Sequence, residues 1–487
     1  MSKKYITAGL EPEKVLNSFE DICRIPHGSY HTQMISDWLR DFAVKRNLRH
    51  IQDEAGNVIM FKDGTKGHEN AEPLMLQGHM DMVLEKNSDN PIDMEKEAIT
   101  LMIDGDNLKA DGTTLGGDDG IAVAMMLALL DSEDIVHPPL ECVFTVDEEV
   151  GMLGMEALDP SPLRSKRMLN LDSEQEGVFT AGCAGGAEEE LTLHVERKPQ
   201  YGIQLQIEVS GLLGGHSGES IDRGRANADL VLARILYKLY KKVPFYLISI
   251  NGGSKDNAIP REASALVIFP AGSDRELAAK TIEKHAAFAA AEYQQADPEM
   301  RCTCTWMEDR DLAAAAMTKK YTKRVLKLLL SLPNGLMETD QVSRTPQTSL
   351  NLGILKTDTD TVTIVFLVRS SINSQKKFLC DRLEIIADAY DAEIRTVSAY
   401  PAWEYAHHSE FRDTLAGIYE KKTGKKPVIS VTHGGLECGL LAAKMDGLDC
   451  LSIGPDMEGI HTPSEKLSIS SVRRCWEFLL AALEALA

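Results

Sequence analysis

The chain has 487 residues, 43% of them hydrophobic and 26% charged, so it is long enough for two or three domains and has a globular composition. Its formal net charge of -22 disfavours nucleic acid and anionic lipid as partners. The N-terminal residues have no apolar core of signal-peptide length, and the longest apolar run, 121–130, is too short to span a membrane. Nine cysteines without a CxxC pair indicate reduced thiols, which together with these features predicts a cytoplasmic chain.

Short apolar segments alternate with a helical stretch in the first 186 residues. Residues 74–76, 140–144 and 168–171 have the pattern of buried strands, and an apolar, helix-like stretch at 120–130 follows a glycine-rich turn. This alternation predicts a mostly parallel α/β sheet. The glycine-rich segment 182–186 then interrupts the pattern and is a candidate hinge.

The pattern changes from 187 to 400. Apolar and polar residues alternate at 191–195 and 362–367, which indicates sheets with one solvated face, and helices are expected near 227–239 and 376–390. After Pro401 a strand at 449–454 and a final helix at 469–487, capped by Ser468, restore the α/β pattern. We therefore predict an α/β domain formed by 1–186 and 401–487, interrupted by an α+β domain at 187–400 that could comprise two similar halves.

Five polar motifs could carry chemistry, and four of them follow a predicted strand directly. Taken singly, each is common: adjacent acids at a helix N-terminus, for example, are usually caps. Together they are informative, because side chains beyond the carboxyl ends of parallel strands converge at one edge of the sheet. The motifs are 77–81 with His79 and Asp81, 116–120 with Asp118 and Asp119, 147–151 with Glu148 and Glu149, 170–174 with Asp172, and 459–465 with His461.

Two histidines and three carboxylates suit two divalent metal ions that share one carboxylate. Such mixed nitrogen and oxygen ligands fit zinc, with manganese or cobalt as alternatives. Two adjacent metal ions favour hydrolysis, and a spare carboxylate beside the ligands can serve as general base. The residues alone leave open which of the neighbours Glu148 and Glu149 is the base and which is the ligand.

The five motifs in this order resemble the M20 family of metallopeptidases over nearly the whole chain. The segments 76–83, 182–186 and 433–439 resemble most closely the members that cleave aminoacyl-histidine dipeptides. The resemblance implies that Asp118 bridges the two metals and that Glu148 is the general base. It further implies that His79 and Asp172 complete one metal site, that Glu149 and His461 complete the other, and that Asp81 orients His79.

The resemblance also implies roles outside these motifs. His216, between glycines at 215–218, would stabilise the oxyanion of the tetrahedral intermediate. Asn257 would contact substrate, and Arg369 would bind a substrate carboxylate. Glu437 is expected to bind substrate as well. Asp119 stands where relatives often carry Asn, which adds negative charge near the metals.

The leading hypothesis is a dipeptidase of broad side-chain tolerance that accepts unblocked dipeptides, including carnosine-like Xaa-His substrates, and forms a homodimer through the inserted domain. One alternative is an N-acyl-amino-acid deacylase or carboxypeptidase, which would use the same metals with a different pocket. Another is a non-catalytic binding protein on the same scaffold, against which the intact Glu148 argues. A requirement for a free substrate α-amine separates the first two hypotheses.

Overall fold

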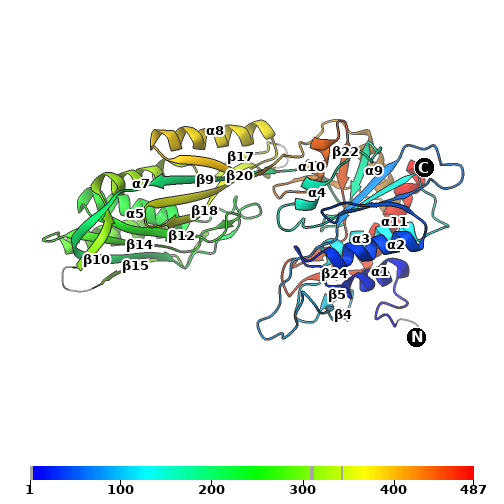
Figure 1. Ribbon diagram of the computed structural model, residues 1–487, viewed down its shortest axis with the longest axis horizontal. Helices are drawn as coiled ribbons and strands as arrows, with labels where there is room; N and C mark the ends of the chain where they lie inside the picture. Colours follow the sequence, from blue (N-terminus) through cyan, green and yellow to red (C-terminus); the bar gives the residue numbers. More distant parts are fainter. Residues whose placement is uncertain (1–3, 308–311, 342–343) are drawn as a thin grey trace. The chain divides into compact units, whose positions relative to one another are not determined.

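The computed structural model describes residues 4–307, 312–341 and 344–487 (Figure 1). The chain forms two compact units, of which unit 1 comprises Met1–Cys183, Tyr405–Val431 and Leu436–Ala487, and unit 2 comprises Ala184–Glu404 and Thr432–Gly435. The chain therefore leaves unit 1 twice, once for a long insertion and once for four residues. The sequence pattern predicts that 432–435 belong to the α/β domain, whereas these residues lie in unit 2.

Unit 1 is built on an eight-stranded sheet with the order β1-β2-β6-β3-β7-β22-β8-β21. The neighbours β6, β3, β7 and β22 are parallel, while β1, β2 and β8 pair antiparallel. The central strands β3 and β6 are buried along their whole length, as expected of parallel strands covered on both faces. The bounds are β1 Arg49–Gln52, β2 Val58–Lys62, β3 Leu74–His79, β6 Leu140–Thr145, β7 Arg167–Asn170, β8 Val178–Cys183, β21 Val428–Thr432 and β22 Asp449–Ser452.

Helices of unit 1 pack on this sheet and on one another. The helix α3 (Gly117–Leu130) is buried on every side between β3 and α1 (Glu13–Cys23), which explains its unbroken apolar sequence. The C-terminal helix α11 (Ile469–Leu486) is capped by Ser468, whose side chain accepts from Ser471 N, as predicted. The remaining elements are α2 Gln33–Lys45, α4 Leu153–Ala157, α9 Glu410–Thr423, α10 Glu437–Lys444 and a small sheet of β4 Leu101–Asp104, β5 Asn107–Ala110, β23 Met457–Glu458 and β24 Lys466–Ser468.

Unit 2 contains a long antiparallel sheet with the order β15-β10-β14-β12-β18-β19-β9-β20, and its helices contribute to one core with the sheet. The predicted alternation of buried and exposed residues is present, for example along β9. The bounds are β9 Gly185–His194, β10 Arg197–Ser210, β11 Gly215–His216, α5 Ala228–Lys242, β12 Tyr246–Gly252, β13 Ala258–Ile259, β14 Ala263–Pro270, α6 Arg275–Glu292, β15 Arg301–Trp306, β16 Leu312–Met317, α7 Lys319–Ser331, β17 Gly335–Thr339, β18 Pro346–Thr357, β19 Thr361–Ser370, α8 Asn373–Ala389 and β20 Glu393–Tyr400.

The sheet of unit 2 consists of two halves with the same order of elements. One half is β10-α5-β12-β14-α6-β15 and the other is β9-α7-β18-β19-α8-β20, so each has the strand-helix-strand-strand-helix-strand arrangement of a ferredoxin-like fold. The strand orders are mirrored about the junction of β12 with β18, where Gly252 pairs with Leu355. The first half is inserted in the chain between β9 and α7 of the second.

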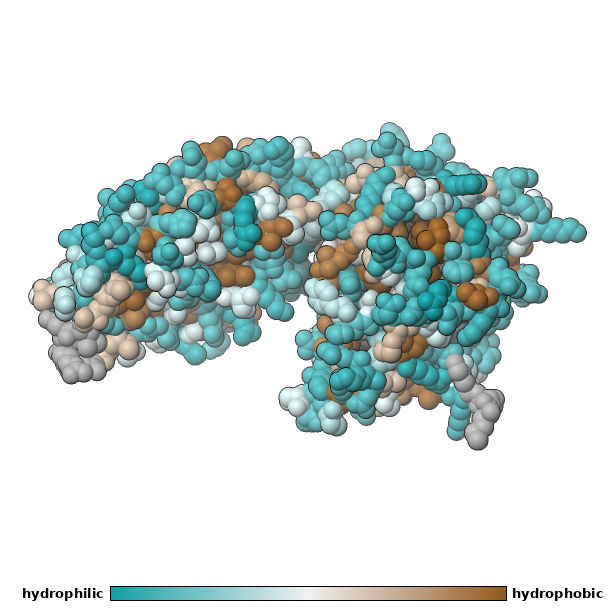
Figure 2. Space-filling model, in the orientation of Figure 1, coloured by the Kyte–Doolittle hydropathy of each residue, from teal (hydrophilic) through white to brown (hydrophobic). Residues whose placement is uncertain are grey.

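Hydrophilic side chains cover most of the face seen in Figure 2, in keeping with a net charge of -22. Within the described ranges, none of the helices combines the length and the apolar character needed to cross a membrane.

Candidate metal centre

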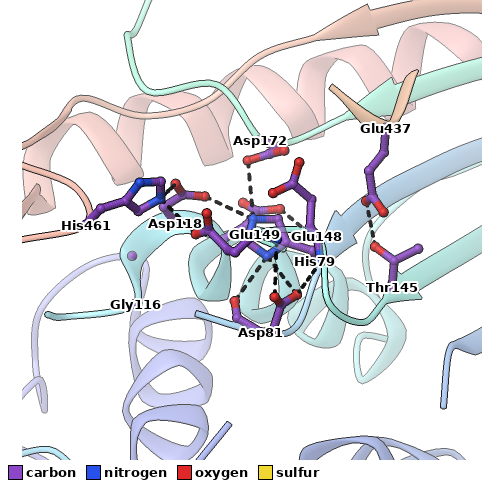
Figure 3. Close-up of polar contacts among 12 residues, drawn as sticks. His79, Asp81, Gly116, Asp118, Thr145, Glu148, Glu149, Asp172, Glu437 and His461 are labelled. Carbon is purple, nitrogen blue, oxygen red and sulfur yellow. Dashed lines mark hydrogen bonds and ion pairs between the residues drawn. The ribbon is translucent and has the colours of Figure 1, made fainter. Parts of the chain in front are cut away.

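Seven of the predicted site residues lie together at the carboxyl ends of the parallel strands of unit 1 (Figure 3). His79 ends β3, the acids at 148 and 149 follow β6, and Asp172 lies two residues beyond β7. Asp118 comes from the start of α3, which packs on β3, and His461 comes from the loop between β23 and β24. A Cβ on Gly78 would collide with the Asp119 carboxylate, so the glycine permits this close approach of α3 to β3.

Asp118 lies between the two histidines and directs one carboxylate oxygen at each. Its Oδ1 is 3.0 Å from His79 Nε2, and its Oδ2 is 3.2 Å from His461 Nε2. Glu149 Oε1 lies 2.8 Å from the same His461 nitrogen, and Asp172 Oδ1 lies 3.7 Å from His79 Nε2. This is the arrangement of a carboxylate shared by two sites, each completed by one histidine and one further acid.

Asp81 orients both a histidine and the backbone of the acidic turn. His79 Nδ1 lies 3.0 Å from the carbonyl oxygen of Asp81 and 3.3 Å from its Oδ1. With the Nδ1 proton donated there, the lone pair of Nε2 points at Asp118 and is available to a metal. The Asp81 carboxylate also accepts from Glu148 N at 3.0 Å and from Ser29 Oγ at 2.8 Å.

The site carries an excess of acids, and their pKa values reflect it. Burial raises the pKa of Glu148 and of Asp172 well above their usual range, and nearby carboxylates raise both further. Burial opposes charge on His461, but hydrogen bonds to Asp118 and Glu149 outweigh it and raise its pKa to about 11. No Lys or Arg joins these acids in an ion pair within the described part of the chain. In the described residues only the two histidines pair with these acids, so much of the negative charge of the cluster is left for bound metal ions to balance.

The distances also fit bound divalent ions. Ligand atoms about 2.0–2.1 Å from a tetrahedral zinc ion lie roughly 3.3 Å from each other, and the separations above range from 2.8 to 3.7 Å. The ligand atoms of His79, Asp118 and Glu149 lie within 4.8 Å of one another, as do those of His79, Asp119 and Asp172. The second group includes Asp119, which the sequence analysis left outside the ligand set. Asp119 Oδ2 accepts from His79 N at 3.2 Å, and its Oδ1 is buried without a partner in the described residues.

Among the described residues, Glu148 is the one acid of the cluster whose carboxylate makes no hydrogen bond or ion pair with a candidate ligand. Its backbone is fixed by Asp81, while its side chain has no hydrogen-bond partner among the described residues. Figure 3 shows it beside His79 and Glu149. A partly buried carboxylate with a raised pKa, adjacent to metal ligands, has the properties of a general base.

Glu465 supports the site structurally, a role that the sequence did not predict. Its carboxylate accepts from three consecutive backbone amides, Leu115 N at 2.7 Å, Gly116 N at 3.2 Å and Gly117 N at 2.8 Å. It thereby ties the loop of His461 to the turn that presents Asp118. The only local indication in the sequence was an acid four residues after His461. The pattern could not identify its partners, which lie about 350 residues earlier in the chain.

The predicted residues outside unit 1 form a second group, in unit 2. His216 lies on β11 and pairs with Ala258 of β13, next to Asn257. Asn351 of β18 holds this turn by donating to the carbonyl oxygens of Asp256 and Ala258, each at 2.8 Å. The first half of unit 2 thus carries His216 and Asn257, and a side chain of the second half holds the turn that contains Asn257.

Arg369, near the end of β19, is buried and has no carboxylate partner among the described residues. It is 6% exposed, and its Nη1 donates to Tyr400 Oη at 3.2 Å. His433, in the four-residue segment of unit 2, contacts Ser349 Oγ through Nε2 at 2.7 Å. Burial, with Arg369 and His216 nearby, lowers the pKa of His433 to about 4, so it is neutral at pH 7. A buried guanidinium without a counter-charge indicates a site for an anionic group.

Comparisons with known proteins bear on this arrangement. Residues 75–485 match the model of peptidase family M20/M25/M40. The cytosol non-specific dipeptidase of Escherichia coli strain K12 is 34% identical over 478 residues, which cover 98% of each chain. The crystal structure of aminoacylhistidine dipeptidase from Vibrio alginolyticus superposes with a TM-score of 0.86 at 35% identity, covering 99% of this chain and 98% of that one. The aminopeptidase PepT structure from Bacillus cereus, at 16% identity and a TM-score of 0.57, shares the fold.

Proposed function

Because the chain belongs to peptidase family M20/M25/M40, we propose that it is a metal-dependent dipeptidase that hydrolyses unblocked dipeptides, Xaa-His substrates among them. The observation that carries the proposal is the position of Asp118, which has one oxygen facing His79 and the other facing His461. Glu148 lies in the same cluster, and its carboxylate has no hydrogen-bond partner among the described residues. The names of the two relatives with 34–35% identity support the choice of dipeptides.

In the proposed mechanism each side chain has a distinct task. His79, Asp118, Asp172, Glu149 and His461 would hold two divalent ions, which polarise the scissile carbonyl and acidify water. Glu148 takes a proton from the attacking water and returns it to the leaving amine. Asp81 keeps His79 in the tautomer that binds metal.

Unit 2 would act as a lid that recognises the substrate, with unit 1 as the catalytic domain. Arg369 binds the terminal carboxylate of the dipeptide, Asn257 adds a neutral hydrogen bond, and His216 stabilises the oxyanion. The uncompensated charge of buried Arg369 supports this assignment. One of the four chain crossings between the units falls at Cys183 and Ala184, inside the segment expected to act as the hinge.

The finer features of the proposal are zinc as the native metal, a cytoplasmic location and a homodimer. Mixed histidine and carboxylate ligands support zinc, and manganese or cobalt satisfy the same donors. The nine cysteines are free, which fits a reducing compartment.

We expect the metal-loaded chain to hydrolyse free dipeptides and to leave tripeptides and N-acetyl amino acids intact. A dipeptide places its carboxylate one residue from the scissile bond, and a third residue would displace it from Arg369. The three substrate classes are compared at equal concentration by chromatographic assay of released amino acids. Cleavage of acyl amino acids alone would establish a deacylase instead, and absence of turnover on every class would indicate a binding protein.

Asp118→Ala should lose both metals, whereas His461→Ala should lose mainly one. The reason is that the Asp118 carboxylate faces both histidines, while His461 serves a single site. Elemental analysis of each variant after dialysis against metal-free buffer measures the stoichiometry. Equal metal losses in the two variants would contradict a bridging Asp118.

A further inference from the structure

A buried hydrogen-bond network joins the ends of three strands that lead into the metal centre. Thr145 ends β6, Asn170 ends β7, and Gln77 lies two residues before His79 in β3. Asn170 Nδ2 donates to Gln77 Oε1 at 2.7 Å, and Gln77 Nε2 donates to Thr145 Oγ1 at 3.3 Å. All three side chains are fully buried, so their polar atoms have only each other and nearby protein groups as partners.

Glu437, the first residue of α10, joins this network from outside the strands (Figure 3). One of its oxygens, Oε2, accepts from Gln77 Nε2 and from Thr145 Oγ1, the latter at 2.6 Å. Its other oxygen is buried and has no hydrogen-bond partner in the described chain. The residue is 0% exposed, so it presents no accessible atom to a substrate in this structure. Burial also raises its pKa to about 7, which favours a proton on the unpartnered oxygen.

We propose that Glu437 is a positioning residue, which fixes the ends of β3 and β6 through Gln77 and Thr145 and thereby places His79 and Glu148. The inference rests on the proposed function, since the placement of these groups matters for the hydrolysis. It differs from the direct contact with substrate that the sequence analysis expected of Glu437.

The connections from the network to the reacting groups are short. His79 is two residues beyond Gln77, and Glu148 is three beyond Thr145, across a turn in which Asp147 has a φ of 55°. If the Glu437 acceptor is lost, Thr145 Oγ1 loses its acceptor, Gln77 Nε2 loses one of its two acceptors, and the strand ends must rearrange. Outer partners of metal ligands typically contribute about 10–100-fold to metal affinity or activity. We expect an effect of that size.

Two substitutions separate the positioning role from substrate contact. Glu437→Gln keeps an oxygen that can accept both bonds and places an amide where the protonated oxygen would be. Glu437→Met has similar length but no comparable acceptor. We expect Glu437→Met to lower kcat about 10–100-fold with KM within threefold, and Glu437→Gln to recover most of that loss. The d–d spectrum of bound Co²⁺ should change, and Co²⁺ affinity should fall, in Glu437→Met alone.

Glu141 supplies the matched control, because it is also a buried glutamate bonded to neighbours but lies at the opposite end of β6. It is 4% exposed and accepts from Arg164 N and Ser165 N. Glu141→Met should lower the melting temperature at least as much as Glu437→Met while leaving kcat and the Co²⁺ spectrum unchanged. An equal loss of kcat in Glu141→Met would show that the loss in Glu437→Met comes from general destabilisation, and it would overturn the proposal.

The partners themselves give a second test. Thr145→Val removes one of the two donors to Glu437. If the two residues act together, the double variant Glu437→Met with Thr145→Val should have the kcat of Glu437→Met alone. If the two losses of kcat multiply, the residues act independently, which would contradict the proposal. A Glu437→Gln variant with raised KM and normal Co²⁺ binding would indicate substrate contact and overturn the proposal. If the wild-type chain cleaves no dipeptide, the proposed function fails, and the Co²⁺ measurements still decide whether Glu437 positions the site.

Discussion

Glu148→Gln should abolish nearly all turnover while both metals stay bound. The amide has almost the same shape as the carboxylate but cannot take a proton from the attacking water. Loss of a general base costs about 10²–10⁴-fold. The backbone of residue 148 is held by Asp81 and not by its own side chain, so the substitution should leave the turn in place. Steady-state kinetics with metal analysis of the same sample measure both quantities.

Asp147→Asn is the matched control for this substitution. It is the neighbouring acid-to-amide change, and Asn retains an oxygen that can accept from Tyr30 N, as Asp147 Oδ1 does at 2.7 Å. Asparagine also tolerates the φ of 55° at this position. We expect its kcat to stay within about threefold of wild type, because the Asp147 side chain bonds the backbone of Tyr30 and no group of the proposed reaction. Near-normal turnover in Glu148→Gln would refute the assignment of the base.

Arg369→Ala should lower kcat/KM for dipeptides about 10–100-fold and leave the metal content unchanged. A lost charge-assisted hydrogen bond typically costs about 1.5–3 kcal/mol, and each 1.4 kcal/mol corresponds to a factor of ten. Arg369 belongs to unit 2 and the proposed metal ligands to unit 1, so the two readouts are separable. The measurement is kcat/KM for a dipeptide and for its C-terminal amide.

The amide comparison isolates the contact that Arg369 makes. Wild type should prefer the free acid, and Arg369→Ala should lose this preference. Arg395→Ala serves as control, because this arginine lies on β20 of the same sheet and pairs with Glu190 at the surface. A change in kcat/KM of less than threefold in Arg369→Ala would rule out the proposed carboxylate contact.

That the candidate ligands lie together was predictable, because this follows from a general property of parallel sheets. His79, Glu149 and Asp172 each follow a short apolar segment, and β3, β6 and β7 are parallel neighbours whose carboxyl ends meet. Helices were also predicted closely where periodicity and a cap coincide. The stretch expected at 227–239 is α5 with Asn227 as its N-cap, and the final helix begins after Ser468.

Other features depend on contacts between distant parts of the chain, for which local patterns give no signal. Glu437 meets Gln77 across 360 residues, and nothing in either neighbourhood indicates the pairing. The antiparallel edges of the first sheet and the placement of 432–435 in unit 2 likewise depend on contacts between distant segments. The two halves of unit 2 share an order of elements without a recognisable sequence repeat, because many sequences satisfy the same alternation of buried residues.

The junction of β12 with β18 has a consequence for how the lid responds to dilution. Each half of unit 2 would, by itself, leave an open sheet edge at this junction, along β12 in one half and along the part of β18 that β17 does not pair with in the other. Such an edge invites pairing with another chain. Here the two edges meet at Gly252 and Leu355, and the two halves are covalently linked, so their association is intramolecular. Its strength is set by an effective concentration, typically millimolar for short linkers, and not by the amount of protein. The two-stranded sheet of β11 and β13, which carries His216 and is held at residues 256 and 258 by Asn351 of the other half, should therefore stay assembled at any enzyme concentration.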